Sequence, residues 1–155
     1  MTSCREAALA YLARRALARR ELERKLRRKG FDAAEVEQVL NALTAAGLVD
    51  DAATSEALAR SRTVRGVGRN RIAFELRSRG LGRDDIDGAL AKIPAEDERA
   101  ALRGALDRKA RTLPVGLTPA ATSKKLFDHL VRRGFSVAAV LEALRKKGES
   151  PDDPE

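Results

Sequence analysis

Few side chains in this sequence are of types that catalyse reactions or bind metal ions. The chain has a single histidine, His129, and a single thiol, Cys4. A Ser-His-Asp arrangement needs a histidine beside its nucleophile, whereas His129 falls in the middle of a predicted helix. No group of Cys, His or carboxylate residues has the spacing of a metal site. We therefore predict a protein that is not an enzyme, with no catalytic residues, no metal and no cofactor.

Basic residues are the side chains that could recognise a ligand. The formal net charge is +8, which favours an anionic partner, most often a nucleic acid. Residues 14–29 hold nine basic residues against two acidic ones, and residues 60–83 hold eight against one. The positive charge is thus concentrated on two stretches of the chain.

The helix dipole explains some of these basic residues but not others. Arg27, Arg28 and Arg77 fall in the last turns of predicted helices, where the dipole favours a cation and no ligand is needed. Eight arginines near predicted helix starts and links lack that explanation, and we predict that they contact an anionic partner: Arg14, Arg15, Arg19, Arg20, Arg62, Arg65, Arg69 and Arg71.

The aromatic residues indicate whether a nucleic acid could bind by base stacking. Proteins that bind single strands by base stacking need exposed rings. We expect Phe74, Phe127 and Tyr11 to pack inside the fold, and Phe31 and Phe135 to act as hydrophobic staples. Contacts with phosphates or with an acidic protein face are therefore expected rather than a stacking platform.

A repeated helix–turn–helix pattern positions these residues. Three segments align on Gly30, Gly80 and Gly134, which are 50 and 54 residues apart. Apolar residues stand eight and four positions before each glycine and predict one face of a helix. Each glycine is expected to cap that helix in the left-handed conformation. An apolar residue, an N-cap residue and a second apolar residue follow, as in Phe31, Asp32 and Val36.

Each pair of helices is preceded by a further predicted helix, over residues 5–15, 52–64 and 97–111. The fold class is therefore all-α, with three tandem three-helix repeats over 1–49, 50–95 and 96–147 that stack into an elongated, curved rod. Thr118 and Pro119 read as the N-cap and first residue of a helix. The polar segment 148–155 is predicted to be a disordered tail.

The lone cysteine and the absence of a long apolar run bear on location. No internal disulfide can form, and no run approaches the ~20 apolar residues of a membrane span. The N-terminus lacks the apolar core of a signal peptide. We expect a cytoplasmic monomer without membrane contact.

The sequence resembles the RecX family over about residues 5–146. Its central block matches a Gly-Leu-Leu-Asp-Asp turn, a Gly-x-Gly link and an Arg-Ile-x-x-Glu-Leu-x-x-Lys-Gly helix. The matching residues are Gly47, Leu48, Asp50, Asp51, Arg62, Gly66, Gly68, Arg71, Ile72, Glu75, Leu76 and Gly80. Glu21, Leu22, Lys25 and Leu26 match the first repeat, and Leu130, Arg132, Arg133, Gly134 and Phe135 match the third.

Two departures from the family pattern concern local packing. The family usually has an aromatic residue and alanine after Asp-Asp, where this chain has Thr54 and Ser55. It often caps the second helix with serine, where this chain has Ala18. Loss of such a cap typically costs ~1 kcal/mol.

The resemblance implies a regulator of the RecA recombinase in DNA repair, recombination and the SOS response. RecX proteins bind RecA filaments on single-stranded DNA and lower the ATPase, strand-exchange and coprotease activities of RecA. The eight arginines are then expected to contact the filament or its phosphates, with Lys124, Lys125, Arg132 and Arg133 as secondary candidates.

Two alternatives remain open at the level of sequence. The protein could be a stand-alone nucleic-acid-binding module, although the helices after the glycines are acidic, with Glu35, Asp84 and Asp85, and would be repelled by phosphates. It could also be a scaffold that binds only protein, which would make its binding less sensitive to salt.

Overall fold

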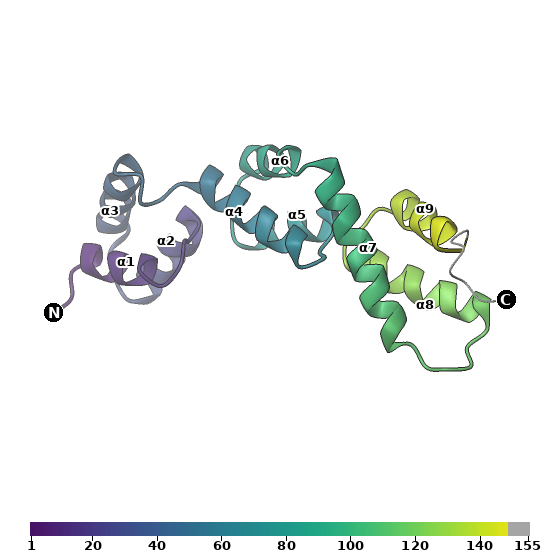
Figure 1. The fold of residues 1–155 in the computed structure, drawn as a ribbon. Coiled ribbons are helices and arrows are strands. Elements are labelled where there is room, and N and C mark those ends of the chain that lie inside the picture. Colours follow the sequence, from purple (N-terminus) through teal and green to yellow (C-terminus); the bar gives the residue numbers. More distant parts are fainter. Residues whose placement is uncertain (149–155) are drawn as a thin grey trace. The chain divides into compact units, whose positions relative to one another are not determined.

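The computed structural model describes residues 1–148, and these residues form α-helices joined by short turns (Figure 1). No strand occurs within this described part, so the predicted all-α class is confirmed. The helices are α1 (Cys4–Leu12), α2 (Arg19–Arg28), α3 (Ala33–Ala45), α4 (Asp51–Val64), α5 (Arg69–Ser78), α6 (Arg83–Ala91), α7 (Ala95–Thr112), α8 (Pro119–Arg132) and α9 (Val137–Gly148).

The chain divides into two compact units. Unit 1 comprises Met1–Leu58 and Glu75–Lys92, and unit 2 comprises Ala59–Phe74 together with the chain from Ile93 onward. The helices follow one another in triplets, but these units do not coincide with the predicted repeats 1–49, 50–95 and 96–147. The repeat boundaries and the rod shape therefore stay predictions. Apart from Gly148, the predicted disordered tail 148–155 lies outside the described residues.

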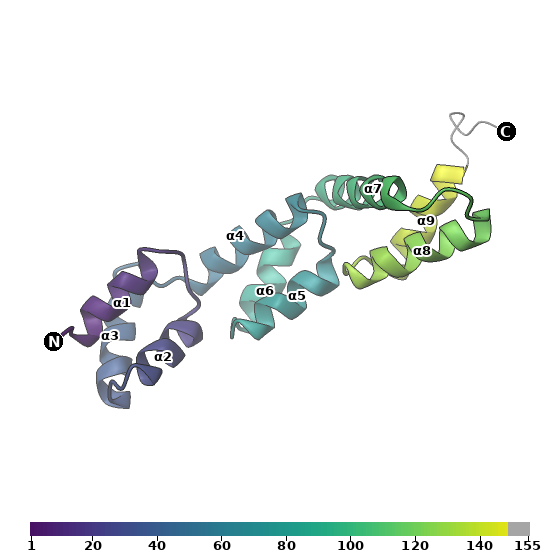
Figure 2. The ribbon, with the colours of Figure 1, turned by 90° about the horizontal axis from the view of Figure 1, so that it is seen from below.

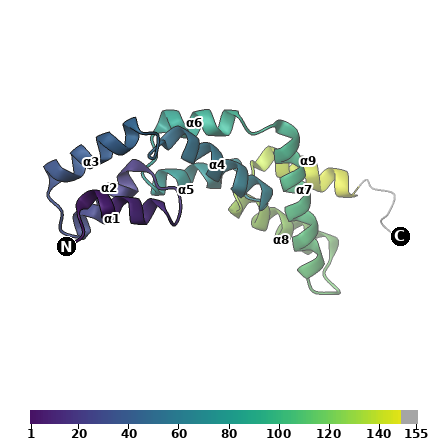
Figure 3. The same cartoon turned by 60° about the vertical axis from the view of Figure 1, so that its left-hand side comes forward.

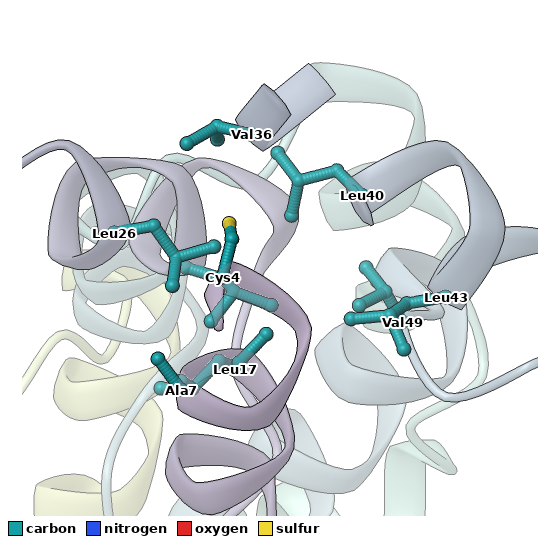
Figure 4. Packing of buried hydrophobic residues seen from close by; sticks show 10 residues of the cluster. Cys4, Ala7, Leu17, Leu26, Val36, Leu40, Leu43 and Val49 are labelled. Carbon is teal, nitrogen blue, oxygen red and sulfur yellow. The ribbon is translucent and has the colours of Figure 1, made fainter. Parts of the chain in front are cut away.

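The first three helices of unit 1 enclose an apolar core. Leu22 and Leu26 of α2 are fully buried and pack with Leu40 and Leu43 of α3. Cys4 of α1 lies among the same side chains (Figure 4) and is 1% exposed, and burial raises the pKa of its thiol. Cys4 is therefore a small core residue with little thiolate character.

In unit 2, α7, α8 and α9 pack against one another (Figures 2 and 3). Leu102 and Leu106 of α7 meet Leu130 of α8 and Val140 of α9 in the core, and Phe135 from the turn between α8 and α9 joins them at 2% exposed. The apolar positions predicted around Gly134 thus fill this core.

The same turn follows α2, α5 and α8. Gly30, Gly80 and Gly134 have φ values of +102°, +83° and +98°, a conformation that favours glycine. After each glycine, the next amide donates to a carbonyl five residues back, as Phe31 does to Leu26 at 3.3 Å. This is the Schellman pattern, and it confirms the predicted left-handed caps.

Helix starts follow the predicted caps at several positions. The Thr118 hydroxyl accepts from the Ala121 amide at 3.2 Å, with Pro119 as the first residue of α8. Asp32 caps α3 through the Ala34 amide at 3.1 Å. One prediction was too long: α1 ends at Leu12, whereas residues 5–15 were expected to be helical, because the Arg14 amide turns back to the Tyr11 carbonyl at 3.2 Å.

The missing serine cap of α2 is replaced from a distant part of unit 1. Ala18 has no side chain that can cap, but the Asp51 carboxylate accepts the Arg19 amide at 2.8 Å. The Glu21 carboxylate accepts the Ala18 amide at 3.2 Å. An acidic oxygen near these amides also suits the positive end of the helix dipole. The first residue of α4 therefore caps α2.

In unit 2, the link between α4 and α5 docks onto the end of α8 through backbone atoms. The Gly68 amide donates to the Arg133 carbonyl at 2.8 Å, and the Asn70 amide donates to the Gly134 carbonyl at 3.0 Å. A Cβ at Gly68 would collide with the Gly134 backbone, and a Cβ at Gly134 would lie 2.5 Å from the Arg71 Cβ. Both glycines are needed for this close approach.

Substitution of Gly134 by alanine should therefore cost more stability than the same change at Gly30. Both positions have a positive φ, which costs an alanine roughly 1–2 kcal/mol. A Cβ at Gly30 meets nothing within 4 Å, whereas one at Gly134 meets backbone. Steric overlap of this kind typically adds about 1–3 kcal/mol. Urea unfolding followed by circular dichroism would measure both, and equal losses would contradict the close approach at Gly134.

Replacement of Ser55 by alanine should stabilise the protein by about 1 kcal/mol. Ser55 is fully buried, and its hydroxyl has no hydrogen-bond partner among the described residues. Thr63, which is also buried in α4, donates instead to the Ala59 carbonyl at 2.9 Å, so Thr63→Val is the matched control and should destabilise. Urea midpoints would check both changes, and a loss of stability in Ser55→Ala would mean that its hydroxyl is satisfied.

Candidate anion-binding interface

A basic groove of about 860 Å³ lies in unit 1 between α2 and the turn that joins α5 to α6. Five of its side chains are arginines and one is a carboxylate. The lining residues are Arg20, Glu23, Arg24, Arg27, Arg28, Arg77, Ser78 and Gly80. The groove is therefore strongly positive and suits a polyanion.

The amphipathic character of α2 positions most of these arginines. Leu22 and Leu26 turn one face of the helix into the core, so the basic side chains occupy the opposite face. Gly80 lets the α5–α6 turn come close, because a Cβ there would lie 2.8 Å from the Arg20 Cβ and 2.9 Å from an Arg24 Nη atom. The turn that borders the groove thus needs glycine at position 80 both for its positive φ and for its close approach to α2.

The positive charge in the groove is not neutralised within the described chain. Arg20, Arg27, Arg28 and Arg77 make no ion pair with any described residue, and Arg24 donates only to the Arg20 carbonyl at 3.3 Å. Sequence reasoning assigned Arg27, Arg28 and Arg77 to helix dipoles alone. Two last turns from different repeats meet here, and the sequence signal was the recurrence of basic residues just before Gly30 and Gly80.

The other predicted arginines of unit 1 differ in their availability. Arg14 is exposed after α1, and its side chain makes no hydrogen bond or ion pair within residues 1–148, while Arg15 pairs with Glu21 at 3.5 Å. Arg19 donates to Thr44, Glu37 and Asn41 of α3 at 3.0, 3.2 and 2.8 Å. A phosphate would have to compete with these bonds, so Arg19 is best explained by its internal role in joining α2 to α3.

Arg62, Arg65, Arg69 and Arg71 belong to unit 2. Arg69 pairs with Glu98 at 3.1 Å, and Arg71 donates to the Arg132 carbonyl at 3.5 Å. Arg62 is half-buried in the last turn of α4, whereas Arg65 is exposed. Reversing Arg69 to glutamate would place a second carboxylate beside Glu98. A charge reversal at Arg65, Arg69 and Arg71 together would therefore disturb the fold as well as any ligand.

The secondary candidates also separate into two kinds. Lys124 pairs with Asp128 at 3.0 Å, whereas Lys125 and Arg132 are exposed. The Arg133 guanidinium donates to the Gly66 carbonyl at 2.7 Å and to the Arg65 carbonyl at 2.9 Å. Arg133 thus helps to anchor the α4–α5 link.

The prediction for the aromatic residues is wrong at one position. Tyr11 packs on the unit 1 core with Lys25 and Lys29 near its ring, and Phe127 packs on the unit 2 core. Phe74, however, is 63% exposed on α5. It lies one helical turn from Arg71, a spacing that places both on one face. An exposed ring beside a cation can contact a base or an apolar partner surface.

Comparison with known proteins confirms the family resemblance found in the sequence, and it does so over almost the whole chain. Residues 4–43 match the model described as "RecX, first three-helix domain", and residues 50–90 match "RecX, second three-helix domain". The regulatory protein RecX of Halorhodospira halophila is 39% identical over 150 residues, which cover 96% of this chain and 90% of that protein.

The chain belongs to the RecX family. The regulatory protein RecX of Herminiimonas arsenicoxydans is 35% identical over 97% of this chain and 96% of its own length. The crystal structure of RecX from Lactobacillus salivarius has the same fold, with a TM-score of 0.85 at 20% identity, covering 95% of this chain and 96% of that one. A second RecX crystal structure gives a TM-score of 0.83 at 24% identity, covering 92% and 71%.

Membership of the RecX family makes this chain a regulatory protein rather than an enzyme. In the described residues, no group of three or more His, Cys, Asp or Glu side chains could hold a metal ion. None of the helices in residues 1–148 is both long enough and apolar enough to span a membrane.

Removal of two charges from the groove should weaken single-stranded DNA binding and its dependence on salt. Each phosphate contact with a single strand contributes about 0.7 to the slope of log affinity against log salt, so Arg27→Gln with Arg28→Gln should lower the slope by about 1.4. Fluorescence anisotropy with a thymidine oligonucleotide at several salt concentrations would measure this. The control Arg5→Gln with Arg111→Gln removes the same charge from exposed sites outside the groove. An equal effect of both pairs would show that only net charge matters.

Proposed function

We propose that this chain binds the RecA recombinase assembled on single-stranded DNA and inhibits extension of the filament. Inhibition would lower the ATPase, strand-exchange and coprotease activities of RecA and so modulate recombination and repair. The observation that carries this proposal is the match to RecX proteins over almost the full chain. We propose that this activity takes place in the cytoplasm, because RecA assembles on DNA there.

The basic groove of unit 1 supports a role for DNA phosphates in this binding. Its arginines are not neutralised internally, so they can replace the counterions of a strand bound by RecA. Weak, non-specific binding to free nucleic acid follows from the same charges. Arg20, Arg24, Arg27, Arg28 and Arg77 are the residues proposed to make these contacts.

A cluster of acidic residues in unit 1 lies around Asp85. Burial raises the pKa of Asp85, and the nearby charges of Asp51, Asp50 and Asp84 raise it further. A phosphate would be repelled by these four carboxylates. The groove between α2 and the α5–α6 turn, with five arginines and one carboxylate, is the part of unit 1 that suits DNA.

In unit 2, Phe74 and Arg65 are the exposed side chains proposed to contact the filament. An apolar ring of this size on a helix surface gains most when a partner covers it. Lys125 and Arg132 are also exposed and remain secondary candidates. Arg19, Arg69 and Arg133 have internal partners and are proposed to position the elements that carry the others.

A stand-alone nucleic-acid-binding module is the second candidate function, and the groove of arginines is the observation that favours it. The acidic starts of α3 and α6 weigh against a recognition helix that enters the major groove. A non-specific mode through phosphates alone is compatible with both functions. The two differ in whether a few molecules can act on a filament of many RecA subunits.

The DNA-dependent ATPase of RecA should be inhibited at well below one copy of this protein per RecA. Inhibition at such ratios is expected because a molecule that blocks filament growth affects all subunits that would have followed. The ATPase would be measured during titration with this protein at fixed DNA and RecA. The Arg27→Gln/Arg28→Gln variant should need a higher concentration, and the Arg5→Gln/Arg111→Gln control should match the unaltered protein. Inhibition only when the protein coats all the DNA would favour the stand-alone module instead.

A further inference from the structure

A second, smaller basic pocket lies wholly within unit 2, between α7 and α8. Its volume is about 310 Å³. Arg108 and Lys109 enter it from α7, His129 enters from α8, and Arg133 enters from the position directly after α8, with Ala105 and Thr112 completing the lining. No carboxylate lines this pocket, since most acidic residues of α7 lie in its first turn and the pocket lies beside its last turns.

Arg133 is held in place by the α4–α5 link. Its Nε and one Nη atom donate to the carbonyls of Gly66 and Arg65 at 2.7 and 2.9 Å. A guanidinium carries five N–H donors, so these two bonds fix its position and leave other donors for a ligand. The cation is thus oriented before any ligand binds.

Arg108 lies in a space that two glycines provide. A Cβ at Gly66 would collide with its guanidinium, and a Cβ at Gly104 would lie 3.3 Å from its Nη1 atom. Arg108 has no hydrogen bond or ion pair with any of residues 1–148. No described residue therefore pairs with the Arg108 guanidinium, whereas Arg69 and Arg133 have partners within the chain.

The pKa of His129 reflects the positive charge of this pocket. Burial lowers the pKa of its imidazole, and the positive charges of Lys109, Arg133 and Arg132 lower it further. These cations reach it from α7 and from α8. The pocket therefore holds several positive groups that repel one another, and an anion placed among them would relieve that repulsion.

We infer that this pocket of unit 2 binds a phosphate group, carried either by a nucleic-acid strand or by a free nucleotide. Two guanidinium groups, an ammonium and an imidazole converge on it, and they supply more donors than a single carboxylate can accept. Guanidinium forks also suit phosphate oxygens. The inference goes beyond the proposed function, since such a site would bind phosphate whether or not the protein acts on RecA.

The single histidine of the chain makes the test direct, because one imidazole signal belongs to His129 alone. The pKa of His129 would be followed by NMR at constant ionic strength, with chloride exchanged for inorganic phosphate, a nucleoside triphosphate or a thymidine oligonucleotide. Binding should raise this pKa by about 1 pH unit, because a nearby anion favours the charged imidazole. No change with any of the three probes would overturn the inference.

The probes also identify the source of the phosphate. An oligonucleotide that acts at lower concentration than the triphosphate would identify a nucleic-acid backbone, and the reverse order would identify a free nucleotide. A glutamate-rich peptide should have no effect at the same charge concentration. If that peptide raises the pKa of His129 as the phosphate probes do, the pocket takes acidic peptides and the inference is wrong.

Variants of α7 test the geometry. Arg108→Gln should abolish the phosphate-dependent rise, whereas Arg111→Gln, an exposed change on the same helix outside the pocket, should leave it unchanged. Gly104→Ala should reduce it by displacing the Arg108 guanidinium. Lys109→Gln should raise the pKa of His129 without any ligand, because it removes a neighbouring cation. Circular dichroism would confirm that each variant is folded, and an unaltered rise in Arg108→Gln would contradict the site.

Discussion

A left-handed glycine at the end of α2, α5 and α8 determines much of this structure. The positive φ at Gly30, Gly80 and Gly134 reverses the chain, and the amide after each glycine bonds to a carbonyl five residues earlier. That bond positions the apolar side chain that follows the glycine against the preceding helix. At two of these positions, the absence of a Cβ also allows another segment to approach closely. Gly80 lets its turn approach α2, and Gly134 lets the α4–α5 link approach α8.

Both candidate anion sites depend on these approaches. In unit 1, the turn at Gly80 meets α2, so basic residues that precede two different glycines share one groove. In unit 2, the link that docks beside Gly134 supplies the carbonyls that orient Arg133. In each site, charged residues from different parts of the chain meet because a glycine permits the backbone to come close.

The sequence predicted the helices and their caps well, because those features depend on local residues. The repeat of apolar positions before each glycine, the left-handed caps and the Thr118–Pro119 start needed no information from distant parts of the chain. The candidate site was predicted less well. Side-chain partners such as Glu98 for Arg69, or the α3 residues for Arg19, come from elements far along the chain. Position relative to a helix end could not show which arginines are engaged and which are available.

The Asp51 carboxylate that receives the Arg19 amide has a consequence for synthesis of the chain. The two residues are 32 positions apart, and the start of α2 has no side-chain cap of its own. When the ribosome has released α1, α2 and α3, the residue that completes α2 is still being added or remains inside the exit tunnel. Until α4 emerges, the Arg19 amide therefore lacks its carboxylate acceptor. The first turn of α2 consequently gains this hydrogen bond only after synthesis of the next helix has begun.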